Sequence, residues 1–186
     1  MDHTPKLSTL SPELIQAFSR IKLFLCDVDG VLTDASVFIG GENVVERKRF
    51  NIQDGLGLVL LKKSGIPVGW ISARFSPVTL NRARELSVDF LEQSKEGKLA
   101  AVNKLVSQLG IDYSEILFMG DDVVDLQVMQ AVGLPIAVAN ARQDVIAVAK
   151  YVTKAPGGHG AVRETCDLLL KVQGLWDSAI KTYFIS

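Results

Sequence analysis

Apolar residues gather in short runs along the chain, separated by segments with the period of amphipathic helices. Five runs have the length and β-branched content of buried strands: KLFLCD (22–27), IPVGWIS (66–72), VDFLEQ (88–93), EILFMGD (115–121) and LPIAVA (134–139). A weaker sixth run is KYVT (150–153). Strands that alternate with helices predict βαβ units. The expected fold is therefore α/β, with a doubly wound, mostly parallel sheet that carries helices on both faces.

One stretch departs from this alternation. In ASVFIGGENVVERKRFNIQDG (35–55), apolar and polar residues alternate on both sides of Gly40-Gly41. This pattern predicts a small β-hairpin inserted at about 35–50, directly after the first strand.

Composition limits the kind of protein. The chain has 186 residues, 48% of them hydrophobic, so we expect one domain over residues 1–186, with a C-terminal tail at about 155–186. The 20 basic and 21 acidic residues give a formal charge of -1, which offers no large basic field for nucleic acid or a membrane surface. The two cysteines, Cys26 and Cys166, are far apart and indicate neither a disulfide framework nor a cysteine metal site.

The beginning of the chain, MDHTPKLSTLSPELIQAF, lacks the basic and apolar regions of a signal peptide. No apolar run reaches the roughly 18 residues of a membrane-spanning helix. We therefore expect an unexported protein of the cytoplasm that acts on a small molecule.

Polar residues stand where several of the predicted strands end. Asp27 and Asp29 end the first run, Ser72 the second, and Asp121 follows EILFMG. Ligands of doubly wound sheets bind beyond the carboxyl ends of the strands, so these side chains are expected to converge. Asp27 and Asp29 lie two residues apart and would face the same side of an unbent strand, so they point in different directions only if the backbone turns, which Gly30 permits. One carboxylate could then be a nucleophile while the other transfers a proton; taken alone, a helix cap and a turn residue explain the pair equally well.

The segment GDDVVD places Asp121, Asp122 and Asp125 between a strand and a helix. Helix capping explains one such carboxylate, but three within five residues favour a hard cation such as Mg2+. Ser72 and Lys98, read separately, are a turn residue and a solvated lysine. Together with Mg2+, a hydroxyl and a lysine are the usual groups that neutralise a phosphoryl group in transfer to an aspartate.

These residues resemble the motifs of the haloacid dehalogenase superfamily of phosphohydrolases. DVDGVLTD is similar to the first motif, and the resemblance implies that Asp27 is the nucleophile and Asp29 the acid/base. Ser72 matches the second motif, Lys98 the third, and GDDVVD, with Asp121, the fourth. The resemblance further implies that Ser72 and Lys98 stabilise the phosphoryl group. Mg2+ would be held by Asp27, Asp121 and the backbone carbonyl of Asp29.

Within that superfamily the chain resembles the capless phosphatases of 3-deoxy-D-manno-octulosonate 8-phosphate (KDO 8-phosphate), a precursor of lipopolysaccharide. The similar stretches include FNIQDGLGL, ISARFSPVTLNRARELSV and GGHGAVRE. The resemblance implies the following residues for binding of the sugar acid phosphate: Asp29, Asn51, Ile52, Gln53, Asp54, Gly55, Arg74, Arg82, Lys98 and Arg163. A guanidinium pairs bidentately with a carboxylate, which suits Arg74 and Arg82, although surface charge on a helix is the simpler explanation for Arg82.

The chain has no room for a cap domain after the first motif or between the second and third. A site open to water loses electrostatic strength, so a neighbouring subunit is the expected lid. The resemblance implies a homotetramer built on the hairpins, with the tail that carries Arg163 approaching the adjacent site.

Three alternatives stay open. Gln53 stands where these phosphatases usually have arginine, and Ser72-Ala73 where they usually have Thr-Gly, so the substrate could be a related nine-carbon keto-acid sugar phosphate. A receiver-type signalling module would also combine a doubly wound sheet, an acidic pocket, Mg2+ and a lysine, but it has no use for an acid at Asp29. An inactive scaffold is disfavoured because all four motifs are intact.

Overall fold

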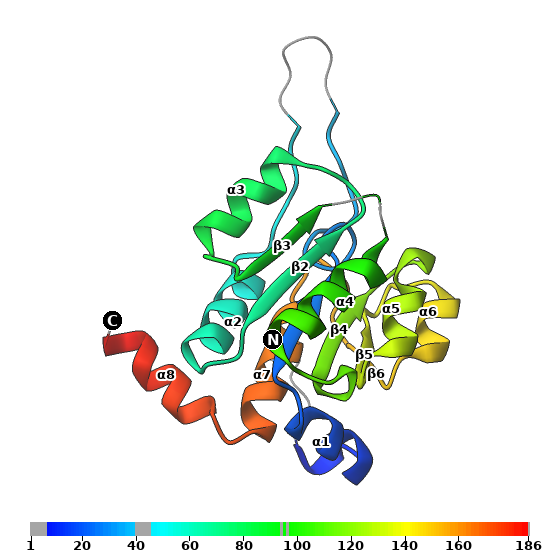
Figure 1. The fold of residues 1–186 in the computed structure, drawn as a ribbon. Helices are drawn as coiled ribbons and strands as arrows, with labels where there is room; N and C mark the ends of the chain where they lie inside the picture. Colours follow the sequence, from blue (N-terminus) through cyan, green and yellow to red (C-terminus); the bar gives the residue numbers. More distant parts are fainter. Residues whose placement is uncertain (1–6, 40–45, 94, 96, 186) are drawn as a thin grey trace.

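Six strands form one parallel sheet in a computed structural model that describes residues 7–39, 46–93, 95 and 97–185 (Figure 1). The strand order is β3-β2-β1-β4-β5-β6, and every neighbouring pair is parallel. The strands are β1 (Leu23–Cys26), β2 (Val68–Ser72), β3 (Phe90–Gln93), β4 (Ile116–Gly120), β5 (Leu134–Ala137) and β6 (Tyr151–Val152). This topology confirms the predicted doubly wound α/β fold.

Helices cover both faces of the sheet (Figure 1). The α-helices are α1 (Pro12–Ser19), α2 (Ile52–Lys63), α3 (Pro77–Glu85), α4 (Lys98–Leu109), α5 (Leu126–Ala131), α6 (Gln143–Val148), α7 (Ala161–Val172) and α8 (Trp176–Ile185). Three short 3-10 helices are η1 (Leu7–Thr9), η2 (Tyr113–Glu115) and η3 (Val123–Asp125). Helices α1, α2, α7 and α8 pack together, as do α4, α5 and α6. Right-handed crossovers explain the two groups, because the chain steps outward from β1 to β3 and then returns past β1 to β4.

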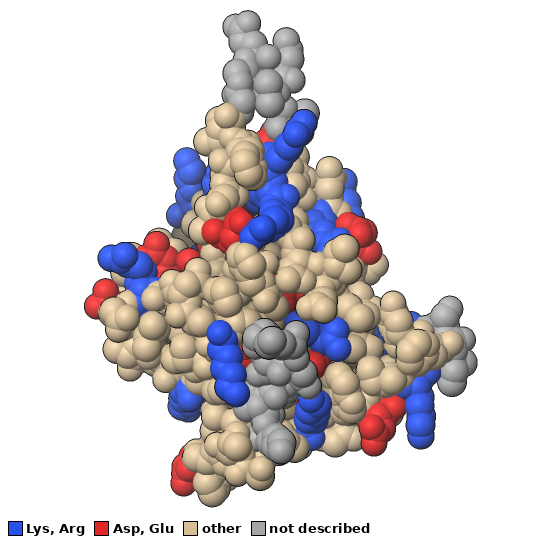
Figure 2. All heavy atoms as spheres, turned by 180° about the vertical axis from the view of Figure 1, so that it is seen from behind, with Lys and Arg blue, Asp and Glu red and all other residues tan. Residues whose placement is uncertain are grey.

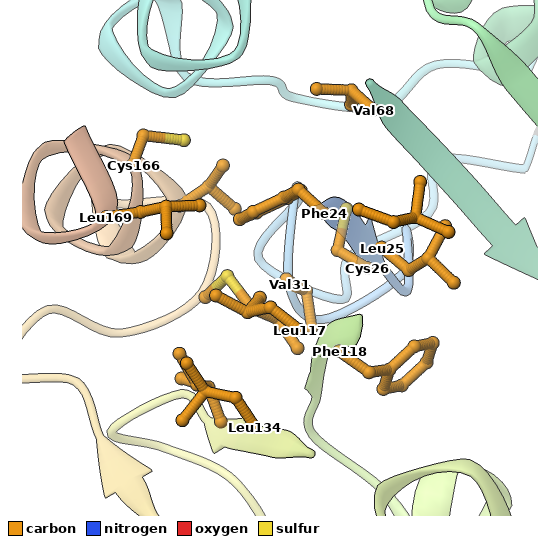
Figure 3. Close-up of a cluster of buried hydrophobic side chains, with 14 of the residues drawn as sticks. Phe24, Leu25, Cys26, Val31, Val68, Leu117, Phe118, Leu134, Cys166 and Leu169 are labelled. Carbon is orange, nitrogen blue, oxygen red and sulfur yellow. The ribbon is translucent and has the colours of Figure 1, made fainter. Parts of the chain in front are cut away.

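The core lies around β1 and β4, whose residues are all buried. Figure 3 shows Phe24, Leu117 and Phe118 packed between the layers, with Cys26 and Cys166 among them. Both cysteines are free thiols. Because the two central strands are apolar throughout, their polar chemistry is confined to the residues that follow them.

The predicted hairpin is present as two antiparallel arms that extend beyond the carboxyl ends of β2 and β3 (Figure 1). Thr33 pairs with Phe50, and Phe38 pairs with Arg47. The predicted turn at Gly40-Gly41 lies outside the described residues.

The surface carries charges of both signs. Figure 2 shows lysine and arginine side chains interspersed with acidic and uncharged ones on one face. Among the helices of the described residues, none has the length and apolar character needed to cross a membrane.

Candidate active site

The point where the sheet reverses direction lies between β1 and β4. From β1 the chain moves to β2 on one side, whereas β4 lies on the other side and continues to β5. Asp27 and Asp121 follow these two strands, and the Asp27 N–H donates to the carbonyl of Met119 at 2.9 Å. In doubly wound sheets ligands bind beyond the strand ends at such a reversal, and both carboxylates lie at this edge of the sheet.

Lys98, the first residue of α4, links two carboxylates at this edge of the sheet. Its Nζ lies 2.7 Å from Asp27 Oδ1 and 2.6 Å from Asp125 Oδ1. The three side chains are 3%, 7% and 0% exposed. Asp125 also accepts hydrogen bonds through Oδ2 from the backbone N–H groups of Asp121 (3.0 Å) and Asp122 (3.3 Å). Asp125 therefore fixes the lysine and the loop after β4 together.

Burial dominates the electrostatics of this cluster. Loss of solvation raises the pKa of Asp27 to about 6, although the Lys98 ammonium opposes the shift. Burial, followed by the charges of Asp27 and Asp125, raises the pKa of Asp121 to about 8. Burial alone would lower the pKa of Lys98, but its two carboxylate partners outweigh that effect and raise it.

The cluster has the donor set of a hard divalent cation. Asp27, Asp121 and Asp125 each offer a carboxylate oxygen, and these oxygens lie within 4.8 Å of one another. Asp121 Oδ1 is buried without a hydrogen-bond partner in the structure, so it has a free acceptor for a cation. Oxygen ligands and excess negative charge fit Mg2+, which would also bring the raised carboxyl pKa values down.

The backbone at Gly30 is shaped around the Asp121 carboxylate. Gly30 has φ +112°, and a Cβ at this position would lie 2.0 Å from Asp121 Oδ2. Thr33 Oγ1 braces the turn by accepting from the N–H groups of Gly30 (3.4 Å) and Ala35 (3.3 Å). The turn predicted at Gly30 is thus present, and only glycine permits both its conformation and its close approach.

Asp29 points to a different set of groups from Asp27. Its Oδ1 lies 2.6 Å from Lys48 Nζ, on the return arm of the hairpin. The Lys48 side chain is fully buried, and its ammonium also donates to Thr79 Oγ1 at 3.1 Å. The turn therefore separates the two carboxylates, one at the acidic cluster and one at the hairpin.

Comparison with known proteins agrees with this arrangement. Residues 70–163 match the family of haloacid dehalogenase-like hydrolases. The curated 3-deoxy-D-manno-octulosonate 8-phosphate phosphatase KdsC of Escherichia coli (strain K12) is 41% identical over 170 residues, which cover 91% of this chain and 90% of that protein. The chain belongs to the haloacid dehalogenase-like hydrolases.

Solved structures resemble this hydrolase over nearly its whole length. The 3-deoxy-D-manno-octulosonate 8-phosphate phosphatase of Moraxella catarrhalis, in complex with a magnesium ion, a phosphate ion and a KDO molecule, is 41% identical with a TM-score of 0.88 and covers 94% of this chain and 99% of its own. The corresponding phosphatase of Yersinia pestis is 38% identical with a TM-score of 0.87, and 90% of each chain is covered.

Ser72 and Arg74 of this hydrolase lie together at the end of β2. The Ser72 hydroxyl is buried, accepts from the Arg74 N–H and donates to the Arg74 carbonyl, both at 3.1 Å. The Arg74 guanidinium contacts Glu46 Oε1 at 2.7 Å. Ser76 Oγ donates to the same Glu46 oxygen at 3.1 Å, so the loop after β2 is tied to the hairpin.

The predicted substrate residues at the start of α2 divide into two groups. Asn51 caps the helix through a 2.7 Å bond from the Gln53 N–H, and Ile52 is 83% exposed. Asp54 turns inward and accepts from the N–H groups of Gly160 (3.3 Å) and Arg163 (2.7 Å). Asp54 thus caps α7, whose own N-cap is a glycine with no side chain. Its role toward a substrate stays a prediction.

The predicted arginines also have contacts within the chain. Arg82 pairs with Glu85 at 2.7 Å and approaches the backbone of Gly55, where a Cβ would lie 2.6 Å from its guanidinium. Arg163 Nε donates to Asp167 at 2.6 Å, and its guanidinium lies 6.0 Å from the Trp176 ring. These contacts hold Arg163 against its own helix, and a reach to another subunit stays a prediction.

Three residues near the site were missed or left without a role by sequence reasoning. Asp125 was noted only as one of three acids, yet it is the buried link between Lys98 and the loop after β4. Lys48 and Glu46 were not singled out. The sequence signal for Glu46 and Lys48 is their alternation with Arg47 and Arg49, because residues two apart lie on the same side of an extended arm.

Proposed function

We propose that this hydrolase removes the phosphate of KDO 8-phosphate, releasing KDO and inorganic phosphate through an aspartyl-phosphate on Asp27. The observation that carries the proposal is the placement of Asp27 at the strand reversal, with Lys98 on one oxygen and the acidic cluster beside it. Relatives of the same activity that are about 40% identical support it.

In the first step Asp27 attacks phosphorus, and the bond from phosphorus to the sugar oxygen breaks in line. Asp29 donates a proton to the departing alkoxide. Lys98 neutralises the charge that builds on the phosphoryl oxygens, and the Ser72 hydroxyl donates to another of them.

In the second step Asp29 takes a proton from water, and the resulting hydroxide attacks the aspartyl-phosphate. The bond between phosphorus and the Asp27 oxygen breaks, which regenerates the carboxylate and releases phosphate. Asp27, Asp121 and the backbone carbonyl of Asp29 would hold Mg2+. When bound, Mg2+ supplies positive charge to the transferring group.

Phosphate release from a panel of sugar acid phosphates tests this function. KDO 8-phosphate should be hydrolysed faster than neutral sugar phosphates, and a chelator should stop the reaction until Mg2+ is restored. Asp27→Asn should abolish turnover while circular dichroism and thermal unfolding remain near those of the wild type. Turnover retained by Asp27→Asn would exclude the aspartyl-phosphate route.

A nine-carbon keto-acid sugar phosphate is the second candidate substrate. This substrate belongs in the panel of sugar acid phosphates because Gln53 stands where related phosphatases usually have arginine. A clear preference for a neutral sugar phosphate would contradict the binding roles proposed for Arg74 and Arg82. A receiver-type module would instead retain its phosphoaspartate and release no phosphate.

We propose a single catalytic domain over residues 1–186 that works as a homotetramer, in which a neighbouring subunit covers the site. A covered rim is supported by four large apolar side chains on the hairpin, at the start of α2 and in the loop after β2, which are 64–83% exposed: Phe38, Ile39, Ile52 and Phe75. A cytoplasmic location and supply of a lipopolysaccharide precursor belong to the same proposal. Sedimentation in solution tests the oligomer, and a monomer that is fully active would exclude the lid.

A further inference from the structure

Lys48 is a buried cation that none of the four motifs includes. Its side chain is fully buried, whereas Asp29 retains 24% exposure on the same ion pair. The ammonium lies 2.6 Å from Asp29 Oδ1, 3.1 Å from Thr79 Oγ1 and 3.8 Å from Glu46 Oε1. Burial of an ammonium costs several kcal/mol that an apolar side chain would avoid, so a purely structural role does not explain a lysine here.

Lys48 is held in place by three separate parts of the chain. Thr79 lies on α3, and Glu46, on the same hairpin arm, is itself fixed by Arg74 and Ser76 from the loop after β2. Asp29 comes directly before the Gly30 turn. The ion pair therefore joins the acid/base residue to the hairpin, α3 and β2 at once.

We infer that Lys48 is the positioning residue for Asp29, holding its carboxylate where it exchanges protons with the leaving group and with water. A general acid must stand within hydrogen-bond reach of its partner, and misplacement by about 1 Å costs on the order of 100-fold in rate. Lys48 acts through Asp29 and contacts no phosphoryl oxygen in this role. The inference rests on the proposed function, because it assigns Lys48 to the proton transfers of that reaction.

The choice of leaving group separates this role from a general effect on the site. An alkoxide, as from KDO 8-phosphate, must be protonated when it leaves, whereas nitrophenolate from p-nitrophenyl phosphate leaves without a proton. Hydrolysis of the aspartyl-phosphate needs Asp29 with either substrate. A protein with a misplaced Asp29 should therefore release nitrophenolate rapidly in the first turnover and then accumulate phosphoenzyme.

Lys48→Met is the test variant, measured by rapid mixing with both substrates. We expect kcat for KDO 8-phosphate to fall about 100-fold or more with KM changed less than about threefold, while first-turnover nitrophenolate release changes less than about threefold. Phosphoenzyme should accumulate with the aryl substrate only. Asp29→Asn should show the same pattern, and the double variant should be no worse than Asp29→Asn, since both act on one function.

Lys22→Met is the matched control, because Lys22 pairs with Glu115 at the same 2.6 Å near the other end of β1. It should leave both substrates unaffected. Lys48→Arg should recover part of the lost kcat. Thr79→Val keeps the lysine and the side-chain volume while removing one anchor, so it should show a milder form of the same pattern if Lys48→Met does not fold.

If Lys48→Met slowed the first turnover equally with both substrates, or slowed it with neither, the inference would be overturned. If the wild type and Asp29→Asn behave as described and the Lys48 and Thr79 variants do not, the inference alone is wrong. If the wild type releases phosphate from neither substrate, the proposed function is wrong and the inference fails with it.

Discussion

Two buried lysines contact Asp27 and Asp29, the first two carboxylates of DVDGVLTD, and the lysines are placed by different parts of the fold. Lys98 begins α4, a helix packed on the core through Val102 and Leu105, and it contacts Asp27 at 2.7 Å. Lys48 lies on a hairpin arm and contacts Asp29 at 2.6 Å. In the proposed mechanism the sheet and its helices thus position the residues of phosphoryl transfer, whereas the inserted hairpin positions the residue of proton transfer.

The largest expected difference between the two lysines is in substrate dependence. Lys98→Met should lower the rate about 1000-fold or more with both alkyl and aryl phosphates, because it removes charge from the phosphoryl group itself. Rapid mixing with KDO 8-phosphate and p-nitrophenyl phosphate measures this. A loss confined to the alkyl substrate would assign Lys98 to proton transfer and remove the contrast with Lys48.

Each lysine has a second carboxylate partner, Asp125 for Lys98 and Glu46 for Lys48, and these two partners should contribute differently to stability. Asp125 is fully buried and accepts from Lys98 and two backbone N–H groups, so Asp125→Ala should lower the free energy of unfolding by about 3 kcal/mol. Glu46 is 18% exposed, and Glu46→Gln should cost under about 1 kcal/mol. Urea unfolding of both variants without Mg2+ compares them, and equal costs would contradict the comparison.

The contrast between the sheet scaffold and the inserted hairpin also explains which parts of the site could be predicted from the sequence. The doubly wound parallel sheet, the Gly30 turn and the meeting of Asp27, Asp121 and Lys98 follow from strand ends and helix starts, which local patterns mark. The contact of Lys48 with Thr79 joins residues 31 positions apart through hairpin docking, and no local pattern states which side of the arm faces the site.

The inward turn of Asp54 has a similar cause. The resemblance to the KDO 8-phosphate phosphatases implies a role for Asp54 in substrate binding, together with Asn51 and Gln53 at the start of α2. Its partners, Gly160 and Arg163, lie more than 100 positions away and are brought near by the packing of α2 on α7. Only the tertiary fold shows that α7 lacks its own side-chain cap and borrows this carboxylate.

A change at Gly30 tests the link between the two carboxylates. Gly30→Ala places a methyl group 2.0 Å from Asp121 Oδ2 at φ +112°, so it should cost about 2 kcal/mol and raise the Mg2+ concentration needed for half-maximal activity. Gly110→Ala is the control, because Gly110 has φ +63° with no atom within 4 Å of the added methyl group. It should cost about 1 kcal/mol through strain alone and leave the Mg2+ requirement unchanged. An equal Mg2+ requirement in both variants would contradict the shaping of Gly30 around Asp121.

The smallest expected effect concerns Asp54, another buried carboxylate, which is held by backbone N–H groups instead of a lysine. Burial raises its pKa from an ordinary 3.8 to about 6, against the opposing effect of those hydrogen bonds. The folded protein therefore binds a proton that the unfolded chain releases between these values. This contributes stability at low pH that is lost as pH rises through about 6.

Asp54→Asn removes this titration, although it also changes the cap of α7 by an amount that does not depend on pH. The wild type should therefore lose about 1 kcal/mol of unfolding free energy relative to Asp54→Asn between pH 5 and pH 7.5. Urea unfolding of both proteins at these pH values gives the difference. Asp112→Asn is the control, since hydrogen bonds from Ser114 lower the pKa of the exposed Asp112 and its titration falls below this window. A difference for Asp54→Asn that stays constant or grows with pH would show that the backbone N–H groups keep the Asp54 carboxylate ionised throughout this pH range.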